Sequence, residues 1–138
     1  MQAYLSFNGN AAQALAFYAQ VLGGKVLNSM TFGESPMGEK LPDAEKNKIM
    51  HSTLEAGGHQ LMAADMPAGM PFKGYSGFTL SVQARNAEEG KKLFDALGAG
   101  GKVTMPFEPT FWSVGFGMLE DKFGVPWMVN VDHAPDAA

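Results

Sequence analysis

The sequence contains no cysteine among its 138 residues. This absence excludes disulfide bonds, thiolate metal ligands and cysteine nucleophiles, and it fits a reducing compartment. The first residues, Met1 to Tyr4, also lack the basic start and apolar run of a secretory signal. We therefore expect a cytoplasmic protein.

Charge and long apolar runs are also scarce. Charged residues make up 17% of the chain, and the formal net charge is −4 without a run of one sign. Such a chain offers no electrostatic surface for nucleic acid. No apolar stretch approaches the roughly 20 residues that a membrane-spanning helix needs. We therefore expect neither nucleic acid nor a membrane as a partner.

Two segments have the spacing of amphipathic helices. In residues 10–23, Asn10 and Gln13 resemble a capping box, and apolar residues follow at helical intervals up to a pair of glycines. Residues 86–98 repeat this pattern, with Asn86 as the expected cap. The sequence predicts one helix in each half of the chain.

The remaining segments have the composition of strands, apart from residues 33–47, where glycine, proline and charge without periodicity predict a mobile loop. Gly57 and Gly58 form a two-residue hairpin turn between two of these strands. The predicted strands cover residues 4–8, 25–32, 48–56, 59–66, 75–83, 102–105, 114–120 and 126–131.

The order strand, helix, three strands therefore occurs twice. We predict an α+β fold of paired βαβββ modules forming an incomplete, curved eight-stranded barrel. The single domain would span residues 1–138, with module one at about 1–66, a link at about 67–74 and module two at about 75–132. A concave groove would be left between the modules, and a small molecule is its expected occupant.

Several motifs resemble the PhnB-like branch of the vicinal oxygen chelate superfamily, which includes glyoxalases, bleomycin-resistance proteins and dioxygenases. The resemblance covers nearly the whole chain except the loop at 33–47, and it implies a homodimer of paired βαβββ modules. The motifs are YLSFNGN at 4–10, YSGFTLS at 75–81, GKVTMP at 101–106, TFW at 110–112, FGM at 116–118 and DKFGVPWMVNV at 121–131.

The resemblance also bears on metal binding. Metal-dependent members of the superfamily place His, Glu or Gln at four pocket-facing strand positions. These positions fall at or beside Ala3, at or next to Met62, at Gly77 and at Met128. None of these side chains suits a hard divalent ion. We therefore expect that the ancestral site is lost, and that the protein binds no metal and no other cofactor.

The histidines offer another route to chemistry. Of His51, His59 and His133, only His51 lies inside a predicted strand. Pairing across the hairpin places Thr53 opposite Met62 and puts His51 on the same, pocket-lining face. His51 is either a binding or acid–base residue or a strand histidine that is hydrogen-bonded to a neighbour.

Aromatic and polar residues of the second half complete the predicted pocket. The aromatic side chains near 111–116 either close the pocket over a flat apolar ligand or bury in a dimer seam. The Asn130 side chain offers a hydrogen bond to a ligand or makes one at the strand edge. The predicted pocket comprises Phe7, His51, Thr53, Met62, Thr79, Phe111, Trp112, Phe116, Met128 and Asn130.

Two other patterns argue against particular chemistries. The glycines within residues 98–101 follow a predicted helix, whereas a nucleotide or methyl-donor loop follows a strand and opens a helix. This context counts against methyltransferase activity. Four scattered carboxylates show no acid–base pair; they are Asp65, Glu108, Glu120 and Asp121.

Three functions stay open from the sequence, and they leave open whether the protein is an enzyme. The first is a small-molecule-binding protein of the PhnB-like, bleomycin-resistance type that works without a metal. The second is a metal-dependent lyase or isomerase that uses His51 and unrecognised ligands. The third is a non-catalytic interaction protein. The aromatic and methionine side chains favour the first.

Overall fold

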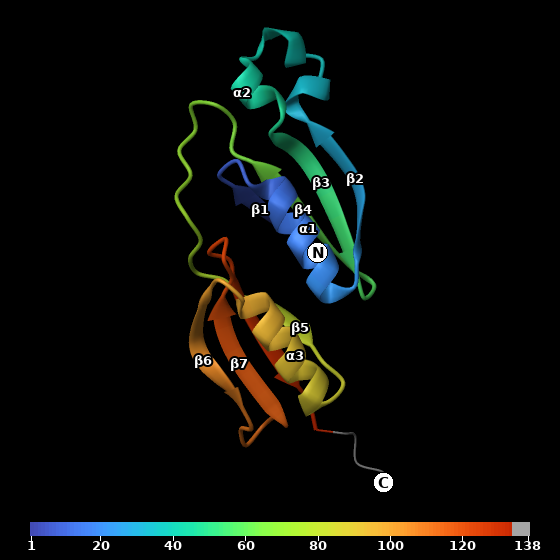
Figure 1. The fold of residues 1–138 in the computed structure, drawn as a ribbon, viewed down its shortest axis with the longest axis vertical. Coiled ribbons are helices and arrows are strands. Elements are labelled where there is room, and N and C mark those ends of the chain that lie inside the picture. The colour runs from blue at the N-terminus through green and yellow to red at the C-terminus, as the bar shows by residue number, and fades with distance from the viewer. Residues whose placement is uncertain (134–138) are drawn as a thin grey trace. The chain divides into compact units, whose positions relative to one another are not determined.

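The computed structural model describes residues 1–133, and the chain folds as two compact units (Figure 1). Unit 1 comprises Met1–Lys73, and unit 2 begins at Gly74. This boundary lies within the link predicted at 67–74. No helix among residues 1–133 is both long enough and apolar enough to cross a bilayer.

Unit 1 is a four-stranded mixed sheet with one long helix. The sheet order is β1-β4-β3-β2, in which β1 runs parallel to β4 and the other neighbours are antiparallel. The elements are β1 (Ala3–Phe7), α1 (Ala11–Leu22), β2 (Lys25–Thr31), β3 (Ile49–Ala56) and β4 (His59–Asp65).

The segment predicted as an irregular loop at 33–47 instead forms short helical turns. These are η1 (Phe32–Glu34), η2 (Gly38–Lys40) and α2 (Asp43–Lys46). A capping box starts the first turn, because Thr31 Oγ1 accepts the Glu34 N–H at 3.2 Å and the Glu34 carboxylate accepts the Thr31 N–H at 3.3 Å. Local hydrogen bonds, rather than hydrophobic periodicity, give this segment its structure.

Unit 2 repeats the topology. Its sheet order is β5-β8-β7-β6, with β5 parallel to β8. The elements are β5 (Leu80–Gln83), α3 (Ala87–Gly98), β6 (Lys102–Glu108), β7 (Gly115–Glu120) and β8 (Pro126–Val131).

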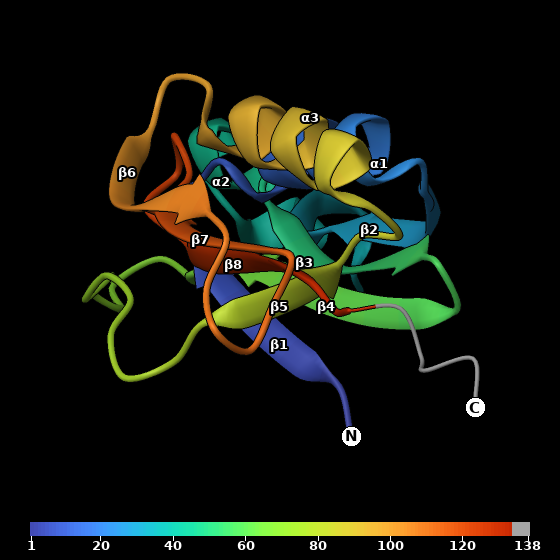
Figure 2. The same cartoon turned by 90° about the horizontal axis from the view of Figure 1, so that it is seen from below.

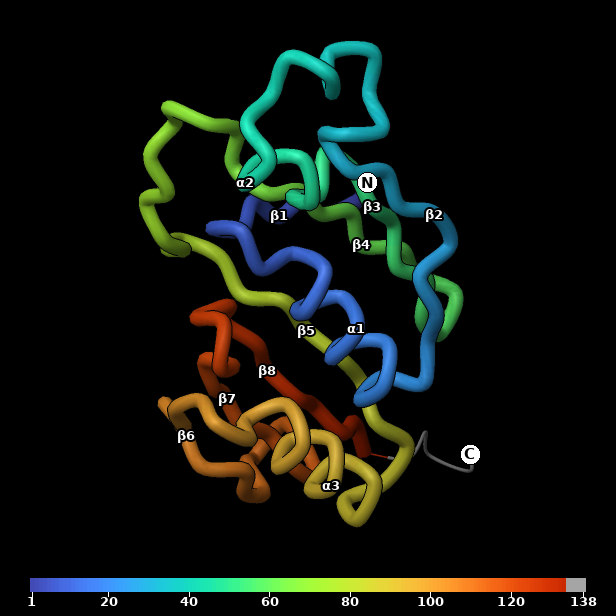
Figure 3. Tube along the Cα trace, turned by 45° about the horizontal axis from the view of Figure 1, so that its top comes forward, coloured from blue at the N-terminus to red at the C-terminus, as the bar shows by residue number. Residues whose placement is uncertain are grey.

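Two strand boundaries in unit 2 differ from the prediction. β5, which is labelled in Figure 3, begins at Leu80 rather than Tyr75. Gly77 has a φ of 80°, which is incompatible with an extended strand. β6 extends to Glu108, past Pro106. Because β6 is an edge strand, it tolerates a residue without an N–H.

The predicted α+β class and the paired βαβββ modules are confirmed. The eight strands within residues 1–133 form two four-stranded mixed sheets that do not close. In each unit the long helix packs on one face of its sheet, α1 on β3 and β2 and α3 on β7 and β8 (Figure 2). Most of the apolar residues at helical spacing are buried, namely Ala11, Ala14, Leu15 and Tyr18 in α1 and Gly90, Phe94 and Leu97 in α3. Leu22 and Leu93, which the same spacing places on these stripes, are only half-buried.

The start of α1 is organised by a carboxylate from the end of β4. The predicted cap at Asn10 is wrong, since its side chain makes no capping hydrogen bond within the described part of the chain. Instead, Asp65 Oδ1 accepts the Ala11 N–H at 2.9 Å, and Oδ2 accepts the Ile49 N–H at 2.8 Å. Asp65 is only 3% exposed, so this buried anion joins α1, β3 and β4.

The start of α3 follows the predicted local pattern. Asn86 Oδ1 accepts the Glu89 N–H at 2.8 Å, which confirms the cap. The Glu89 carboxylate accepts hydrogen bonds from Arg85, and these lower the pKa of Glu89 and raise the pKa of Arg85. Both side chains lie on the surface, so this pair contributes little to stability.

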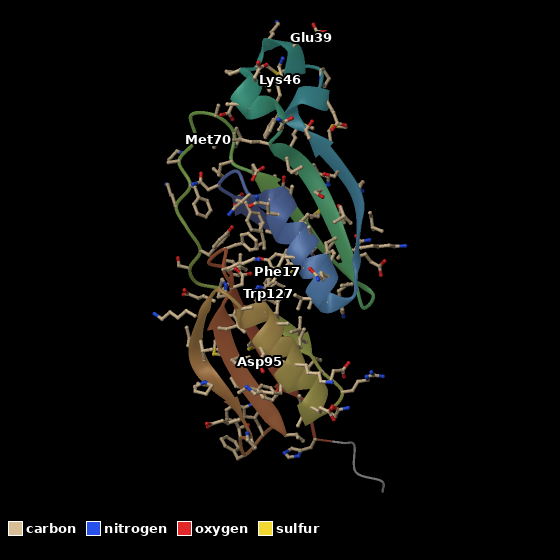
Figure 4. All side chains as sticks on the ribbon, viewed as in Figure 1. Phe17, Glu39, Lys46, Met70, Asp95 and Trp127 are labelled. Carbon is tan, nitrogen blue, oxygen red and sulfur yellow. The ribbon has the colours of Figure 1, made fainter. Side chains whose placement is uncertain are left out.

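Unit 2 has its own buried carboxylate at the turn between β7 and β8. Asp121 Oδ1 accepts the N–H groups of Phe123 and Val125 at 2.8 and 3.0 Å. Its Oδ2 accepts the indole N–H of Trp127, labelled in Figure 4, at 2.9 Å. Asp121 therefore shapes the turn and anchors the first buried side chain of β8.

Close packing in unit 2 depends on glycine at position 117. A Cβ added to Gly117 would lie 2.6 Å from Phe94 Cε2 and 2.8 Å from the backbone Cα of Phe107. A Cβ on Gly98 would meet only Leu119 Cδ2, at an ordinary 3.5 Å. The absence of a side chain at Gly117 lets α3 and β6 approach β7.

We predict that Asp65→Asn lowers the free energy of unfolding by about 1–3 kcal/mol, because an amide nitrogen would face one of the two backbone N–H groups. Urea denaturation measures the change. The control is Asp95→Asn, which alters an exposed i,i+4 pair with Lys91 on α3. It should cost about 0.5 kcal/mol or less. Equal losses in the two variants would contradict a central role for Asp65.

We predict opposite effects for two glycine-to-alanine changes. Gly117→Ala should destabilise by about 1–3 kcal/mol, since the new Cβ meets a backbone atom that cannot move away cheaply. Gly98→Ala should be neutral or stabilising by up to about 1 kcal/mol, because alanine favours the helix. Thermal denaturation of both variants distinguishes them, and an unchanged Tm for Gly117→Ala would overturn the packing argument.

Candidate functional site

Each sheet has one face covered by the helix of its own unit and a second face that this helix leaves free. We call the second face the helix-free face. In unit 1, Tyr4 pairs with Met62, and Met62 pairs with Thr53. His51 lies two residues before Thr53 on β3, so these four side chains share the helix-free face. The pairing of Thr53 with Met62 agrees with the hairpin prediction.

A small polar cluster occupies this face of unit 1. His51 Nε2 lies 3.4 Å from Thr53 Oγ1. The ring centroids of His51 and Tyr4 are 6.1 Å apart, with 37° between the ring planes. Sequence reasoning missed Tyr4, because only the parallel pairing of β1 with β4 places it opposite Met62. The partners of His51 in this cluster are thus a hydroxyl and a phenol ring.

The structure does not bring every predicted pocket residue to these faces. Phe7 is two residues after Leu5, so both side chains lie on the same side of β1. Phe7 is only 1% exposed, which places it on the helix-covered face. Thr79 precedes β5 and is half-buried outside the strand. His59 and His133 are exposed, at the hairpin turn and after β8.

The residues at the ancestral ligand positions do not fit a divalent metal ion. Ala3 shares the helix-covered face with Leu5, and Gly77 lies outside β5. The residues that pair with Met62 and Met128 are instead Tyr4 and Ser81. Phenol, hydroxyl and thioether groups are poor ligands for hard or borderline divalent ions. Within residues 1–133, no group of three or more His, Cys, Asp or Glu could hold such an ion.

The helix-free face of unit 2 carries two rows of side chains that run across all four strands. Each row consists of residues that pair with one another across neighbouring strands. The polar row is Gln83, Asn130, Phe116 and Glu108. The methionine row is Ser81, Met128, Met118 and Met105.

An aromatic cluster, comprising Phe111, Trp112 and Phe116, extends from the polar row. The Trp112 ring meets Phe116 and Phe111 edge-on, with centroids 5.4 and 4.8 Å apart. Phe111 is 94% exposed and Trp112 is 49% exposed. Thr110 holds the loop, because its Oγ1 accepts the N–H groups of Trp112 and Ser113 at 3.3 and 3.0 Å. The predicted aromatic residues therefore lie together, Phe111 and Trp112 on an ordered loop and Phe116 in β7.

Asn130 lies beside Phe116 in the polar row. Its Nδ2 donates to Gln83 Oε1 at 3.1 Å and to Asp132 Oδ1 at 2.7 Å. Its Oδ1 is buried and accepts no hydrogen bond from residues 1–133. Buried acceptors are rarely left unsatisfied in folded proteins, which makes this atom the least satisfied group of the face.

The glycine-rich run does not form a nucleotide or methyl-donor loop. It connects the end of α3 to β6, so its context is helix to strand. Its residue Gly101 approaches the backbone, since an added Cβ would lie 2.1 Å from the Glu120 carbonyl oxygen. Among the carboxylates, Asp65 and Asp121 bind backbone groups, whereas Glu108 and Glu120 are exposed.

Nearly the whole chain is similar to known proteins. The family model described as 3-demethylubiquinone-9 3-methyltransferase matches residues 1–130. Protein YjdN of Escherichia coli K12 is 43% identical over 140 residues, covering 93% of this chain and 92% of that protein. The crystal structure of protein PA1353 from Pseudomonas aeruginosa is 42% identical, with a TM-score of 0.88 over 97% of this chain and 98% of its own.

More distant structures share the fold. A Bacillus cereus protein described as a putative 3-demethylubiquinone-9 3-methyltransferase, PhnB protein, is 25% identical, with a TM-score of 0.80 over 95% of this chain and 98% of its own. The fosfomycin resistance protein FosX of Listeria monocytogenes is 10% identical, with a TM-score of 0.65 over 96% of this chain and 92% of its own. The FosX likeness concerns the fold alone.

Proposed function

The chain belongs to the 3-demethylubiquinone-9 3-methyltransferase family, as a PhnB-like member of the vicinal oxygen chelate superfamily, and from this we propose that it binds a small molecule without a metal ion. The observation that supports this proposal is the aromatic cluster beside the methionine row on unit 2. Exposed apolar side chains grouped on one surface are typical of binding sites. Methionine adapts its shape to a ligand, and aromatic rings offer flat apolar contacts.

Methyl transfer is not part of this proposal, although the family description contains it. The glycine run lies between a helix and a strand, the reverse of a methyl-donor loop. A metal-dependent reaction at His51 is also disfavoured, because Thr53 and Tyr4 are its partners in the cluster. We place the bound molecule on the helix-free face of unit 2. The helix-free face of unit 1, with His51, Thr53 and Met62, is a separate candidate surface.

The protein is also proposed to act as a homodimer in the cytoplasm. Apolar side chains are exposed on the edge strand β2, where Val26, Leu27 and Met30 are 40–44% exposed. Such a surface is suited to a second copy of the chain. A cysteine-free chain has no need of an oxidising compartment, and cell fractionation tests this location.

We predict that light scattering of the purified protein gives twice the mass of one chain at micromolar concentration. Leu27→Glu should shift the protein towards the monomer, because it would place a charge in an apolar seam. Gln20→Glu on the exposed side of α1 should have no effect. A monomeric wild-type protein would rule the dimer out.

We predict that a thermal-shift screen of metabolites and antibiotics finds ligands that stabilise the protein equally with and without EDTA. Trp112→Ala and Met105→Ala should each weaken the binding of such a ligand about tenfold, equivalent to about 1.4 kcal/mol. Met37→Ala, which removes a methionine exposed elsewhere in unit 1, should leave affinity unchanged. A screen without hits, or stabilisation that EDTA removes, would contradict the proposed function.

A further inference from the structure

We propose that the polar row of unit 2 recognises a protonated amino group, and that the apolar body of the same ligand lies over the methionine row. The inference rests on the proposed small-molecule function and specifies the class of ligand. It depends on Asn130, on the charges around it and on the spacing of the two rows.

The orientation of the Asn130 amide is determined by its neighbours. Both Nδ2 hydrogens are used, one by Gln83 Oε1 at 3.1 Å and one by Asp132 Oδ1 at 2.7 Å. A flipped amide would place its oxygen against these two acceptor oxygens. The carbonyl oxygen therefore stays on the other side of the amide.

That oxygen lacks a hydrogen-bond donor. Asn130 Oδ1 is buried, and no group within residues 1–133 donates to it. A buried carbonyl without a donor is unfavourable. The Asn130 residue as a whole is only half-buried, so a small shift of its side chain or its neighbours lets a ligand N–H reach the oxygen and form a hydrogen bond that replaces no existing one. The Asn130 oxygen is therefore available to accept a hydrogen bond from a ligand and cannot donate one.

The charges near this oxygen favour a cation over a neutral donor. Asp132 contacts the Asn130 amide directly, and Glu108 ends the polar row. Neither row contains Lys or Arg. Lys102 lies opposite Glu120 in the register of β6 and β7, beyond the methionine row as seen from the polar row. A carboxylate ligand would therefore meet like charges, whereas an ammonium would meet opposite ones.

The aromatic cluster adds a second attraction for a cation. Phe116 is the neighbour of Asn130 in the polar row, and Trp112 packs edge-on against it. An ammonium group within about 6 Å of a tryptophan or phenylalanine face is attracted by the negative charge of the ring face. The same group can thus approach a carbonyl oxygen, a carboxylate and a ring.

The spacing of the rows sets the size of the apolar part. Neighbouring rows are two residues apart along β5, β7 and β8, which is about 7 Å, and a register shift in β6 puts Met105 and Glu108 three residues apart. A bicyclic aromatic ring attached to the amine through one carbon spans this distance. Arylalkylamines are therefore the ligand class that the two rows accommodate.

A matched set of probes tests this inference at neutral pH. 1-Naphthylmethylamine, 1-naphthylmethanol and 1-naphthoate share one ring system and differ in the charged or polar group. NMR titration of the intact protein yields a Kd for each probe. We expect the amine to bind at least tenfold more tightly than the alcohol, and the carboxylate to bind least.

Variants connect the preference to the polar row. Asn130→Leu should reduce the amine's advantage over the alcohol to threefold or less, whereas Asn47→Leu, at an exposed position after α2, should leave it unchanged. Should Asn130→Leu fail to fold, Glu108→Gln and Asp132→Asn provide the test, since both residues are exposed. Each should reduce the preference at least threefold.

The outcomes separate this inference from the proposed function. Equal binding of amine and alcohol, or a preference that survives these substitutions, overturns the amine site and leaves small-molecule binding intact. Failure of all three probes in a protein that binds other compounds from the thermal-shift screen also overturns the amine site alone. Failure of both the probes and the screen overturns the two together.

Discussion

Asp65 is the residue on which the architecture of unit 1 depends. One carboxylate group receives the first N–H of a helix and the first N–H of a strand, and it does so while buried at the end of a second strand. Charge-assisted hydrogen bonds of this kind are stronger than neutral ones, and a buried anion requires them. The position of α1 on its sheet is therefore set by a polar contact as well as by its apolar stripe.

Unit 2 has the same topology, but two of its residues share the role that Asp65 has in unit 1. Asn86 caps α3 locally, while Asp121 organises the turn between β7 and β8 and binds the Trp127 indole. The tight approach at Gly117 then brings the helix and strands together. The repeat is one of topology, and each copy satisfies its buried backbone groups in its own way.

The division of each sheet into two faces places the candidate site. The helices take up the strongly apolar positions, which leaves aromatic, methionine and amide side chains on the helix-free face of unit 2. Since the ancestral ligand positions hold side chains unsuited to divalent ions, the small-molecule binding that we propose for this face relies on shape and hydrogen bonds. The unsatisfied oxygen of Asn130 gives that face a directional preference that its apolar residues lack.

Local patterns in the sequence were sufficient for the class of fold, both long helices, the Asn86 cap and the pairing of Thr53 with Met62, because a two-residue turn sets the register of its hairpin. The tertiary structure alone decided the rest. Asp65 displaced Asn10 as the helix cap from 54 residues away, and the parallel pairs of β1 with β4 and β5 with β8 brought Tyr4 to Met62 and Gln83 to Asn130. Parallel strands are joined by long connections, so no short-range signal sets their register, and it emerges only when the sheet is assembled.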